Sequence, residues 1–319
     1  MNNLILILLC IICALGTATL VNFAGPVCKS LRLMDIPNTR KLHQHETPLV
    51  GGLCLVLVVL PLLVLVNFNW IDPAYRWPVA IMVAATAIIA LIGMADDRAS
   101  LSATNRIILT SLTFAAVAII QPMFNVRFLQ FAVTSPTTDI GMGIKPISIF
   151  FTTLCCVGLV NAINMADGKN GLVTGLCLGW LTLLAVRAPA PLLPVILIIL
   201  AAITVLFLSN LRGWLFLGDG GSYGFGAVIA FITIAIYNSA DANRVRVMFA
   251  EEAMLLFAVP VFDSFRLTFV RMRRGQSPMA PDRDHLHHHL LSRFGWPLGL
   301  VIYLVLALLP SMLLFLWRR

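Results

Sequence analysis

Charged residues are scarce in this sequence: its 319 residues include 22 Lys and Arg and 14 Asp and Glu, together 11% of the chain. Hydrophobic residues make up 60%, and the mean hydropathy is +0.94. A soluble domain of this length could not bury so much apolar surface, so the composition excludes an ordinary soluble fold. It predicts an integral membrane protein whose helices are surrounded by lipid.

The sequence also lacks a cysteine pattern typical of a metal site or a disulfide framework. Cys10 and Cys13 are spaced as C-x-x-C, but they lie in an apolar run, and no second pair completes a zinc site. Most of the other cysteines lie in apolar runs too, which favours a packing role. Linkers, low-complexity tracts and internal repeats are missing as well, so we predict one membrane domain over residues 1–319.

Apolar runs fill most of the chain, and many are long enough to cross a bilayer, which takes about 20 helical residues. The predicted spans cover residues 3–26, 49–67, 77–95, 105–122, 147–163, 171–187, 190–209, 222–238, 251–269 and 297–317. They predict an all-α, polytopic protein with about ten transmembrane helices. Residues 123–146, between the fourth and fifth spans, mix apolar and polar residues with Pro136, Gly141 and Gly143, which indicates a short β-hairpin.

An even number of spans separates each polar cluster from the next, so we expect all of the clusters on one side of the membrane. They lie in residues 27–48, 96–104, 164–170, 210–221 and 270–296. Most of the lysines and arginines fall on this side, which the positive-inside rule makes cytoplasmic, and the hairpin would then be periplasmic. The net charge of +8 is attributed to topology and anionic lipid, so membrane lipid and not nucleic acid is the expected partner.

An acidic pair, Asp96 and Asp97, directly follows the third span. Adjacent carboxylates repel each other and are costly near lipid unless a cation or a proton transfer uses them. A solvated helix end is the more common origin of such a pair when it stands alone.

Three polar side chains, Asn161, Asn164 and Asp167, close the fifth span at i, i+3 and i+6, which places them along one helical stripe. Gly168 and Gly171 then allow a sharp turn. An ordinary polar helix end with a glycine cap is the alternative, but three amides and acids in register favour a binding surface.

Asp219 lies among glycines, in Gly218-Asp219-Gly220-Gly221-Ser222, at the start of the eighth span. Glycines let a phosphate or a metal approach the backbone, and the free N–H groups of the next helix attract anions. A capped turn with Asp219 or Ser222 as the N-cap is compatible with the same residues. Mg²⁺ prefers oxygen ligands and binds phosphates, so Asp219 is the best candidate for a metal ligand.

Four of the six histidines lie between Asp282 and His289. Histidine is a common zinc ligand, but no cysteine accompanies this cluster, and the carboxylates elsewhere are hard oxygen donors. We therefore interpret the histidines, with Arg283, as donors to a diphosphate.

Asp263 is different, because it lies inside the ninth span. A carboxylate at this depth is costly unless it is paired, and it indicates a functional site. Arg266, one turn later, is its expected structural partner.

Six motifs in this order resemble those of the polyprenyl-phosphate N-acetylhexosamine-1-phosphate transferases, a group within glycosyltransferase family 4. The likeness is nearest to the bacterial branch that uses UDP-N-acetylglucosamine and undecaprenyl phosphate. The motifs are Asp35-x-Pro37-x-x-Arg40-Lys41-x-His43, Pro48-x-x-Gly51-Gly52, Asp96-Asp97-Arg98, Asn161-Ala162-x-Asn164-Met165-x-Asp167-Gly168, Phe216-x-Gly218-Asp219-x-Gly221-Ser222 and Ser277-Pro278-x-x-Pro281-Asp282-Arg283-x-His285-x-His287-His288.

The resemblance implies a Mg²⁺-dependent enzyme, for which Mn²⁺ is a plausible substitute, at the cytoplasmic face of the bacterial inner membrane. It would transfer a sugar-1-phosphate from a UDP-N-acetylhexosamine to undecaprenyl phosphate, release UMP and so start a cell-envelope glycan such as O-antigen. N-acetylglucosamine is the expected sugar, and another N-acetylhexosamine is the alternative. A transporter of lipid phosphate or nucleotide sugar is the competing class, but its charges would lie within the spans, often with an inverted repeat. A homodimer is compatible with the sequence.

The candidate site residues follow from the residues and the resemblance together. Asp96, Asp97 and Asp219 are expected to be catalytic, with Asp219 and Asp167 as metal ligands. Asp97 is either a general base or a positioning group. The expected substrate-binding residues are Arg40, Lys41, His43, Asn161, Asn164, Asp167, Asn170, Asp263, Arg283, His285, His287 and His288. Asn170 and Ser100 stand where close relatives carry acids, which bears on metal affinity and sugar choice.

Overall fold

Long helices dominate the computed structural model of this chain, which describes residues 2–37, 45–132, 138–142, 144–239, 247–277 and 284–317. All of the predicted spans are helical. They are α1 (Asn3–Asn22), the continuous helix formed by α3 (Gly51–Cys54), the π-helical η1 (Leu55–Val59) and α4 (Leu60–Trp70), α5 (Pro73–Ala99), α6 (Ala103–Ile120), α7 (Lys145–Ala166), α8 (Leu172–Arg187), α9 (Leu193–Leu211), α10 (Gly218–Tyr237), α11 (Ala250–Arg273) and α13 (Leu298–Trp317). In the described residues nine helices are long and apolar enough to cross a membrane, and α8 is apolar but shorter. The predicted all-α, polytopic fold is confirmed.

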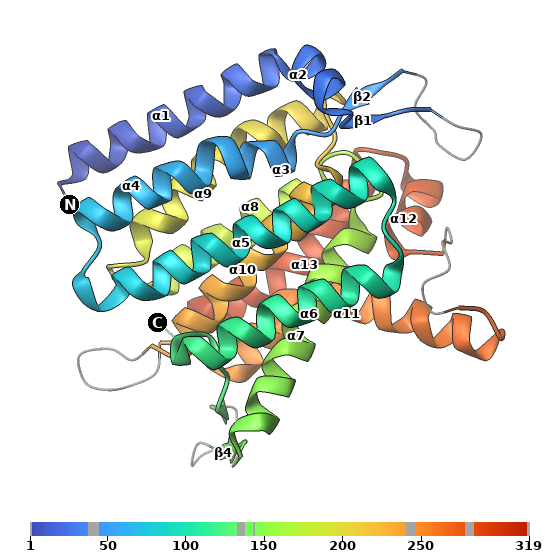
Figure 1. Ribbon diagram of the computed structural model, residues 1–319. Coiled ribbons are helices and arrows are strands. Elements are labelled where there is room, and N and C mark those ends of the chain that lie inside the picture. The colour runs from blue at the N-terminus through green and yellow to red at the C-terminus, as the bar shows by residue number, and fades with distance from the viewer. Residues whose placement is uncertain are drawn as a thin grey trace.

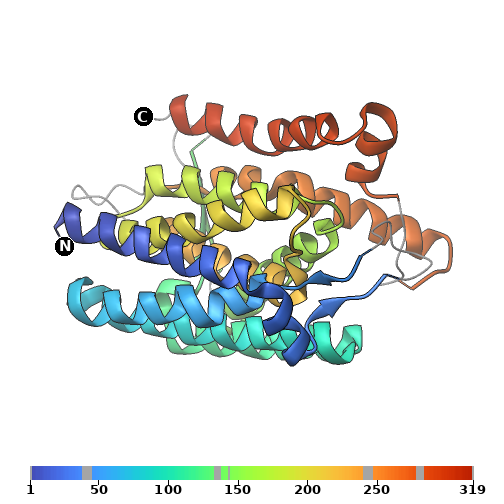
Figure 2. The same cartoon turned by 90° about the horizontal axis from the view of Figure 1, so that it is seen from above.

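The centre of the bundle is α10, whose residues from Gly220 to Tyr237 are all buried. Helices α3, α5, α7 and α8 surround it, whereas α1 and α13 lie at the outside (Figures 1 and 2). Glycines on the neighbouring helices let them pack closely against α10. A Cβ on Gly93 of α5 would lie 2.3 Å from the Asp219 carbonyl oxygen, and one on Gly51 of α3 would lie 2.5 Å from the Leu217 carbonyl oxygen. Glycines therefore bring three helices together where α10 begins.

The polar segments meet at one end of the bundle, which we call the site end. Figure 1 shows there the α5–α6 turn, α12 (Leu286–Phe294) and the antiparallel strands β1 (Met34–Asp35) and β2 (Thr47–Pro48). The chain after β2 runs beside the start of α10, because the Val50 and Gly51 amides donate to the Phe216 and Leu217 carbonyls at 3.0 and 3.1 Å. Both chain termini lie at the opposite end. The predicted gathering of polar clusters on one face is confirmed for the described residues, and its cytoplasmic orientation stays a prediction.

The predicted β-hairpin is confirmed at the opposite end. Strand β3 (Phe128–Phe131) pairs antiparallel with β4 (Thr138–Gly141), with Phe128 opposite Gly141. The Tyr237 hydroxyl, at the end of α10, accepts from the Gln130 amide at 2.9 Å and donates to the Phe128 carbonyl at 2.7 Å. The hairpin is thus fixed to the central helix.

Four elements differ from the sequence prediction. The first span ends at Asn22, and a separate short helix, α2 (Ala24–Leu31), follows it. Strands β1 and β2 were not predicted, because each has only two residues. The segment 270–296 was predicted as a connection, but its histidine-rich part is helix α12, which buries His287 and Leu290. Its polar composition concealed a buried face, on which His287 and Leu290 are spaced i, i+3.

Candidate active site

The carboxylate of Asp97 caps the start of α10. Its Oδ1 accepts from the Asp219 amide at 2.8 Å, and its Oδ2 accepts from the Gly220 amide at 2.9 Å. These N–H groups belong to the first turn of α10 and have no partner within the helix. Gly218 has a φ of +73°, and a Cβ on it would lie 2.8 Å from Asp97 Oδ2, so a glycine is needed at this position. Because both oxygens of Asp97 bind backbone, the geometry favours positioning over general-base catalysis.

Asp96 and Asp219 share a cation that the sequence analysis did not identify. Nη1 of Arg106, in the first turn of α6, lies 2.5 Å from Asp96 Oδ2 and 3.8 Å from Asp219 Oδ2. The signal that could have identified Arg106 is its place at the start of the next span, after the short connection that follows the acidic pair. This arginine therefore joins α5, α6 and α10 at the site end.

The predicted polar stripe on α7 is only partly directed at this group. Asn164 Nδ2 donates to Asp219 Oδ1 at 2.6 Å and to the Ser222 hydroxyl at 3.0 Å. Asn161 Nδ2 instead donates to the Val157 carbonyl of its own helix at 2.8 Å. Asn164 thus lies beside Asp219, whereas the Asn161 side chain is hydrogen-bonded to its own helix.

Asp167 ends α7 beside the same carboxylates. Burial, and then the charge of Asp97, raise the pKa of Asp167 to about 7. Gly171, with a φ of +81°, closes the loop, and its amide donates to Asn210 Oδ1 at 2.7 Å. Asn170 offers its backbone carbonyl to Trp296 Nε1 at 3.0 Å. Residues 167–171 therefore connect the acidic group to the C-terminal part of the chain.

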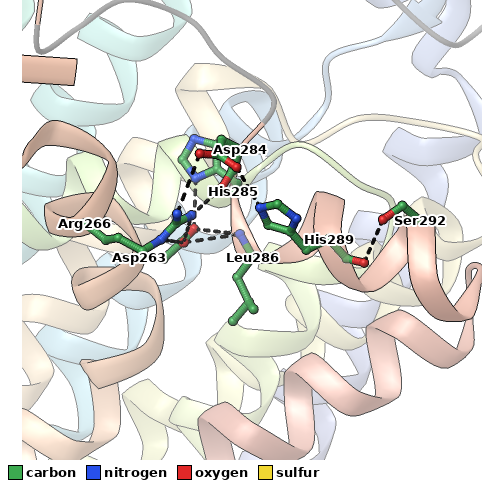
Figure 3. A network of polar contacts seen from close by, with 7 residues as sticks. All are labelled: Asp263, Arg266, Asp284, His285, Leu286, His289 and Ser292. Atoms are coloured by element: carbon green, nitrogen blue, oxygen red, sulfur yellow. Dashed lines mark hydrogen bonds and ion pairs between the residues drawn. The ribbon is translucent and has the colours of Figure 1, made fainter. Parts of the chain in front are cut away.

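A second polar group is organised around Asp263 of α11 (Figure 3). Its Oδ2 binds His285 Nδ1 at 2.9 Å, its Oδ1 accepts from Arg266 Nη2 at 3.0 Å, and the Leu286 amide lies 3.2 Å from both oxygens. The predicted pairing of Asp263 with Arg266 is confirmed, and His285 is a further partner. Asp263 thereby also receives an N–H group from the start of α12. Its carboxylate is surrounded by donors of the chain itself, which favours positioning of His285 over direct substrate contact.

The histidine rings connect the two polar groups. His285 and His287 stack with centroids 5.3 Å apart, and His288 lies 4.3 Å from His287. His287 is 1% exposed, and a Cβ on Gly168 would lie 2.6 Å from its Nε2, so its ring packs on the loop that follows Asp167. Burial, and then the neighbouring His288 and His285, lower the pKa of His287 to about 3, so its imidazole is neutral at ordinary pH. Neither ring nitrogen has a hydrogen-bond partner among the described residues.

The site chemistry is that of oxygen donors beside imidazoles. Within the described residues, no group of three His, Cys, Asp or Glu side chains is arranged to hold a metal ion by itself. Asp167 and Asp219 offer carboxylate oxygens, which suit a hard cation whose remaining ligands come from phosphate and water. Four predicted binding residues, Arg40, Lys41, His43 and Arg283, lie outside the described residues.

Comparisons with known proteins agree with this arrangement. Residues 79–237 match the model of the family described as glycosyl transferase family 4. The "Undecaprenyl-phosphate alpha-N-acetylglucosaminyl 1-phosphate transferase" of Escherichia coli (strain K12) is 30% identical over 310 residues, which are 93% of this chain and 80% of that protein. The "Probable undecaprenyl-phosphate N-acetylglucosaminyl 1-phosphate transferase" of Bacillus subtilis (strain 168) is 29% identical, over 88% of this chain and 77% of that protein.

The family match contains the acidic part of the site, from Asp96 to Asp219. The likeness to the Escherichia coli protein extends over nearly the whole chain, in agreement with the order of motifs in the sequence. With this extent of similarity, and with the motifs gathered at one end of a helical bundle, the chain belongs to glycosyl transferase family 4.

Proposed function

We propose that this protein transfers N-acetylglucosamine-1-phosphate from UDP-N-acetylglucosamine to undecaprenyl phosphate and releases UMP. The observation that carries the proposal is the junction of Asp97, Asp219 and the start of α10 at the site end, next to the histidines of α12. The names of the relatives supply the acceptor and the sugar phosphate. UDP as the carrier follows from the resemblance of the motifs.

The reaction needs little covalent participation by the protein. An oxygen of the lipid phosphate attacks the phosphorus that carries the sugar, a new P–O bond forms, and the bond to the uridine-bearing phosphate breaks, so UMP leaves with the bridging oxygen. A phosphate monoester has a second pKa of about 6, so the attacking oxygen is largely ionised at neutral pH. Catalysis then consists of positioning and charge stabilisation. Asp97 contributes by fixing the start of α10, which suits its place as a helix cap.

Mg²⁺ is the proposed cofactor, with Asp219 and Asp167 as the residues that would hold it. The donor set fits, because both side chains offer carboxylate oxygens and the described part of the site has no thiolate. When bound, the ion would offset the negative charge that develops on the diphosphate. Asn164 would orient the Asp219 carboxylate through its 2.6 Å hydrogen bond. His285, held by the bond between its Nδ1 and Asp263, would donate from Nε2 to a phosphate oxygen in its doubly protonated form.

We place the reaction at the cytoplasmic face of a bacterial inner membrane, as the first step of a lipid-linked cell-envelope glycan. The Lys and Arg distribution supports this side, since most of these residues fall in the segments of the sequence predicted to lie on it. An acceptor with a long apolar chain also requires a site at the membrane boundary, where the helix ends of this bundle lie.

The test is UMP release by the purified protein in lipid, with undecaprenyl phosphate and a panel of UDP-sugars. We expect release only when both substrates are present, with UDP-N-acetylglucosamine as the best donor. Asp219→Asn is the inactive control. Preference for another UDP-N-acetylhexosamine would correct the sugar. Absence of release with every donor, or release without the lipid phosphate, would contradict the proposed reaction.

A further inference from the structure

Arg106 has a position that the proposed reaction does not yet use. One of its terminal nitrogens, Nη1, lies within 4 Å of carboxylates from two different helices: 2.5 Å from Asp96 on α5 and 3.8 Å from Asp219 on α10. The contact with Asp96 is a charged hydrogen bond, whereas the contact with Asp219, at 3.8 Å, is electrostatic only. The Arg106 guanidinium therefore lies between Asp96, which it binds closely, and Asp219, which it contacts at longer range.

The acid in the tighter contact with Arg106 is also the more buried one. The side chain of Asp96 is 5% exposed, while those of Arg106 and Asp219 are 26% and 32% exposed. The buried acid holds the arginine in place, and the more accessible acid is the predicted metal ligand. Because a buried carboxylate is costly without a partner, Asp96 keeps the Arg106 guanidinium beside it.

The other neighbours of Asp219 do not offset its charge. Asp97 is a carboxylate whose two oxygens accept from backbone amides, and Asn164 is neutral. Among the ion pairs within the described residues, those of Asp96 and Asp219 are both made to Arg106. Closely spaced carboxylates repel one another, so this cation stabilises the site before any other cation arrives.

We propose that Arg106 is an internal counter-ion of the active site. It offsets the charge of Asp219 while no divalent cation is bound, and it yields Asp219 to the divalent cation when that ion binds, while it stays paired with Asp96. The inference rests on the proposed function for the identity of the ion as Mg²⁺. It assigns Arg106 a positioning role that tunes cation affinity. A simple structural anchor of α6 would have no such effect.

The experiment measures the melting temperature of the purified full chain against Mg²⁺ concentration, without substrates, at constant ionic strength set with NaCl. The Mg²⁺ midpoint is the concentration at which half of the Mg²⁺-dependent rise in melting temperature has occurred. Arg106→Gln removes the competing charge, so its Mg²⁺ midpoint should be about fivefold lower than that of the wild type, the effect expected for one partly exposed charge pair. Its melting temperature in EDTA should be below that of the wild type, and Mg²⁺ should recover more of it.

Arg187→Gln is the matched control. Arg187 Nη2 lies 2.9 Å from Glu252 Oε1, in another pair of a partly exposed arginine with a buried carboxylate, at the opposite end of the bundle. This variant should lose stability equally with and without Mg²⁺ and keep the wild-type Mg²⁺ midpoint. Arg106→Lys keeps the charge but shortens its reach, so its midpoint should lie between those of the wild type and Arg106→Gln.

A midpoint for Arg106→Gln equal to or above the wild-type value would overturn the proposal, as would a stability loss that Mg²⁺ does not change. If Arg106→Gln does not fold, Arg106→Lys decides, and a midpoint at or above that of the wild type is then the contrary result. Melting temperatures of the wild type and Arg106→Gln that do not change with Mg²⁺ would also refute the proposal. The measurement needs no substrate, so failure of UMP release would refute the proposed reaction without changing this result.

Discussion

At the scale of single residues, the four acids of the site have different partners and hence different expected roles. Asp96 binds a guanidinium, Asp97 binds backbone amides, Asp219 binds the amide of Asn164, and Asp167 is half-buried near Asp97. The sequence shows four acids on one face but not these partners, because side-chain pairing depends on how the helices pack. Substitutions should therefore separate the acids that position the site from Asp219 and Asp167, the two proposed metal ligands.

Asp97→Asn and Asp219→Asn should differ in stability although both reduce transfer. An asparagine at 97 keeps an oxygen for one backbone N–H but turns its own N–H toward the other, so one of the two capping bonds of α10 is lost, at a cost of about 1–2 kcal/mol. Asp219→Asn keeps an oxygen for Asn164 and should retain nearly the wild-type melting temperature while transfer is abolished. Thermal unfolding and UMP release of both variants provide the check. If Asp97→Asn were inactive but fully stable, general-base catalysis by Asp97 would become the better account.

Asp263→Asn should weaken substrate use through His285. The variant replaces charged hydrogen bonds, which contribute about 1.5–3 kcal/mol each, by weaker ones and frees the imidazole to turn. We expect kcat/KM for the UDP-sugar to fall by about tenfold or more, with Asp263→Glu recovering part of it. His289→Ala is the control, because His289 is 58% exposed and pairs with Asp284 at the surface. Equal losses in Asp263→Asn and His289→Ala would argue against a specific positioning role.

At the scale of elements, α12 links the histidines to the acidic loop, and its stability should depend on pH. His287 has a pKa of about 3 in the folded protein, against about 6.5 in an unfolded chain. The unfolded chain therefore binds more protons between these values, and stability is lost as the pH falls below about 6.5, by up to about 1.4 kcal/mol per pH unit. Melting temperatures from pH 7.5 to 5 should fall less in His287→Gln than in the wild type. Parallel curves would show that another group controls the acid response.

The start of α10 should be the element most sensitive to added volume. Gly93→Ala would place a Cβ 2.3 Å from the Asp219 carbonyl oxygen, where backbone must shift, so we expect a loss of about 1–3 kcal/mol and of most activity. Gly158→Ala on α7 has no atom within 4 Å of its Cβ and should be neutral or stabilising by up to about 1 kcal/mol. Thermal unfolding and UMP release of the pair test the packing argument. Normal activity in a stable Gly93→Ala protein would contradict it.

At the scale of the whole molecule, hydropathy and parity predicted most of the architecture. Lipid requires long apolar helices, so the spans are visible in the composition, and the number of spans between clusters decides which helix ends meet. The contacts that complete the site were not visible. Arg106 resembles any basic residue at a span end, and α12 has the composition of a polar loop. Asn161 shares its helical stripe with Asn164, yet it binds its own helix, since a short amide can satisfy itself locally.

The orientation of the molecule is the remaining prediction at this scale. In a cysteine-free background, Gln276→Cys reports on the site end, and Ile140→Cys reports on the hairpin, where Ile140 is 51% exposed. Positive-inside topology places Gln276 in the cytoplasm, since this segment is rich in arginine. An impermeant thiol reagent added to intact cells should therefore label Ile140→Cys and leave Gln276→Cys unlabelled until the cells are opened. Labelling of Gln276→Cys in intact cells would invert the topology, and a donor made inside the cell could then not reach the site.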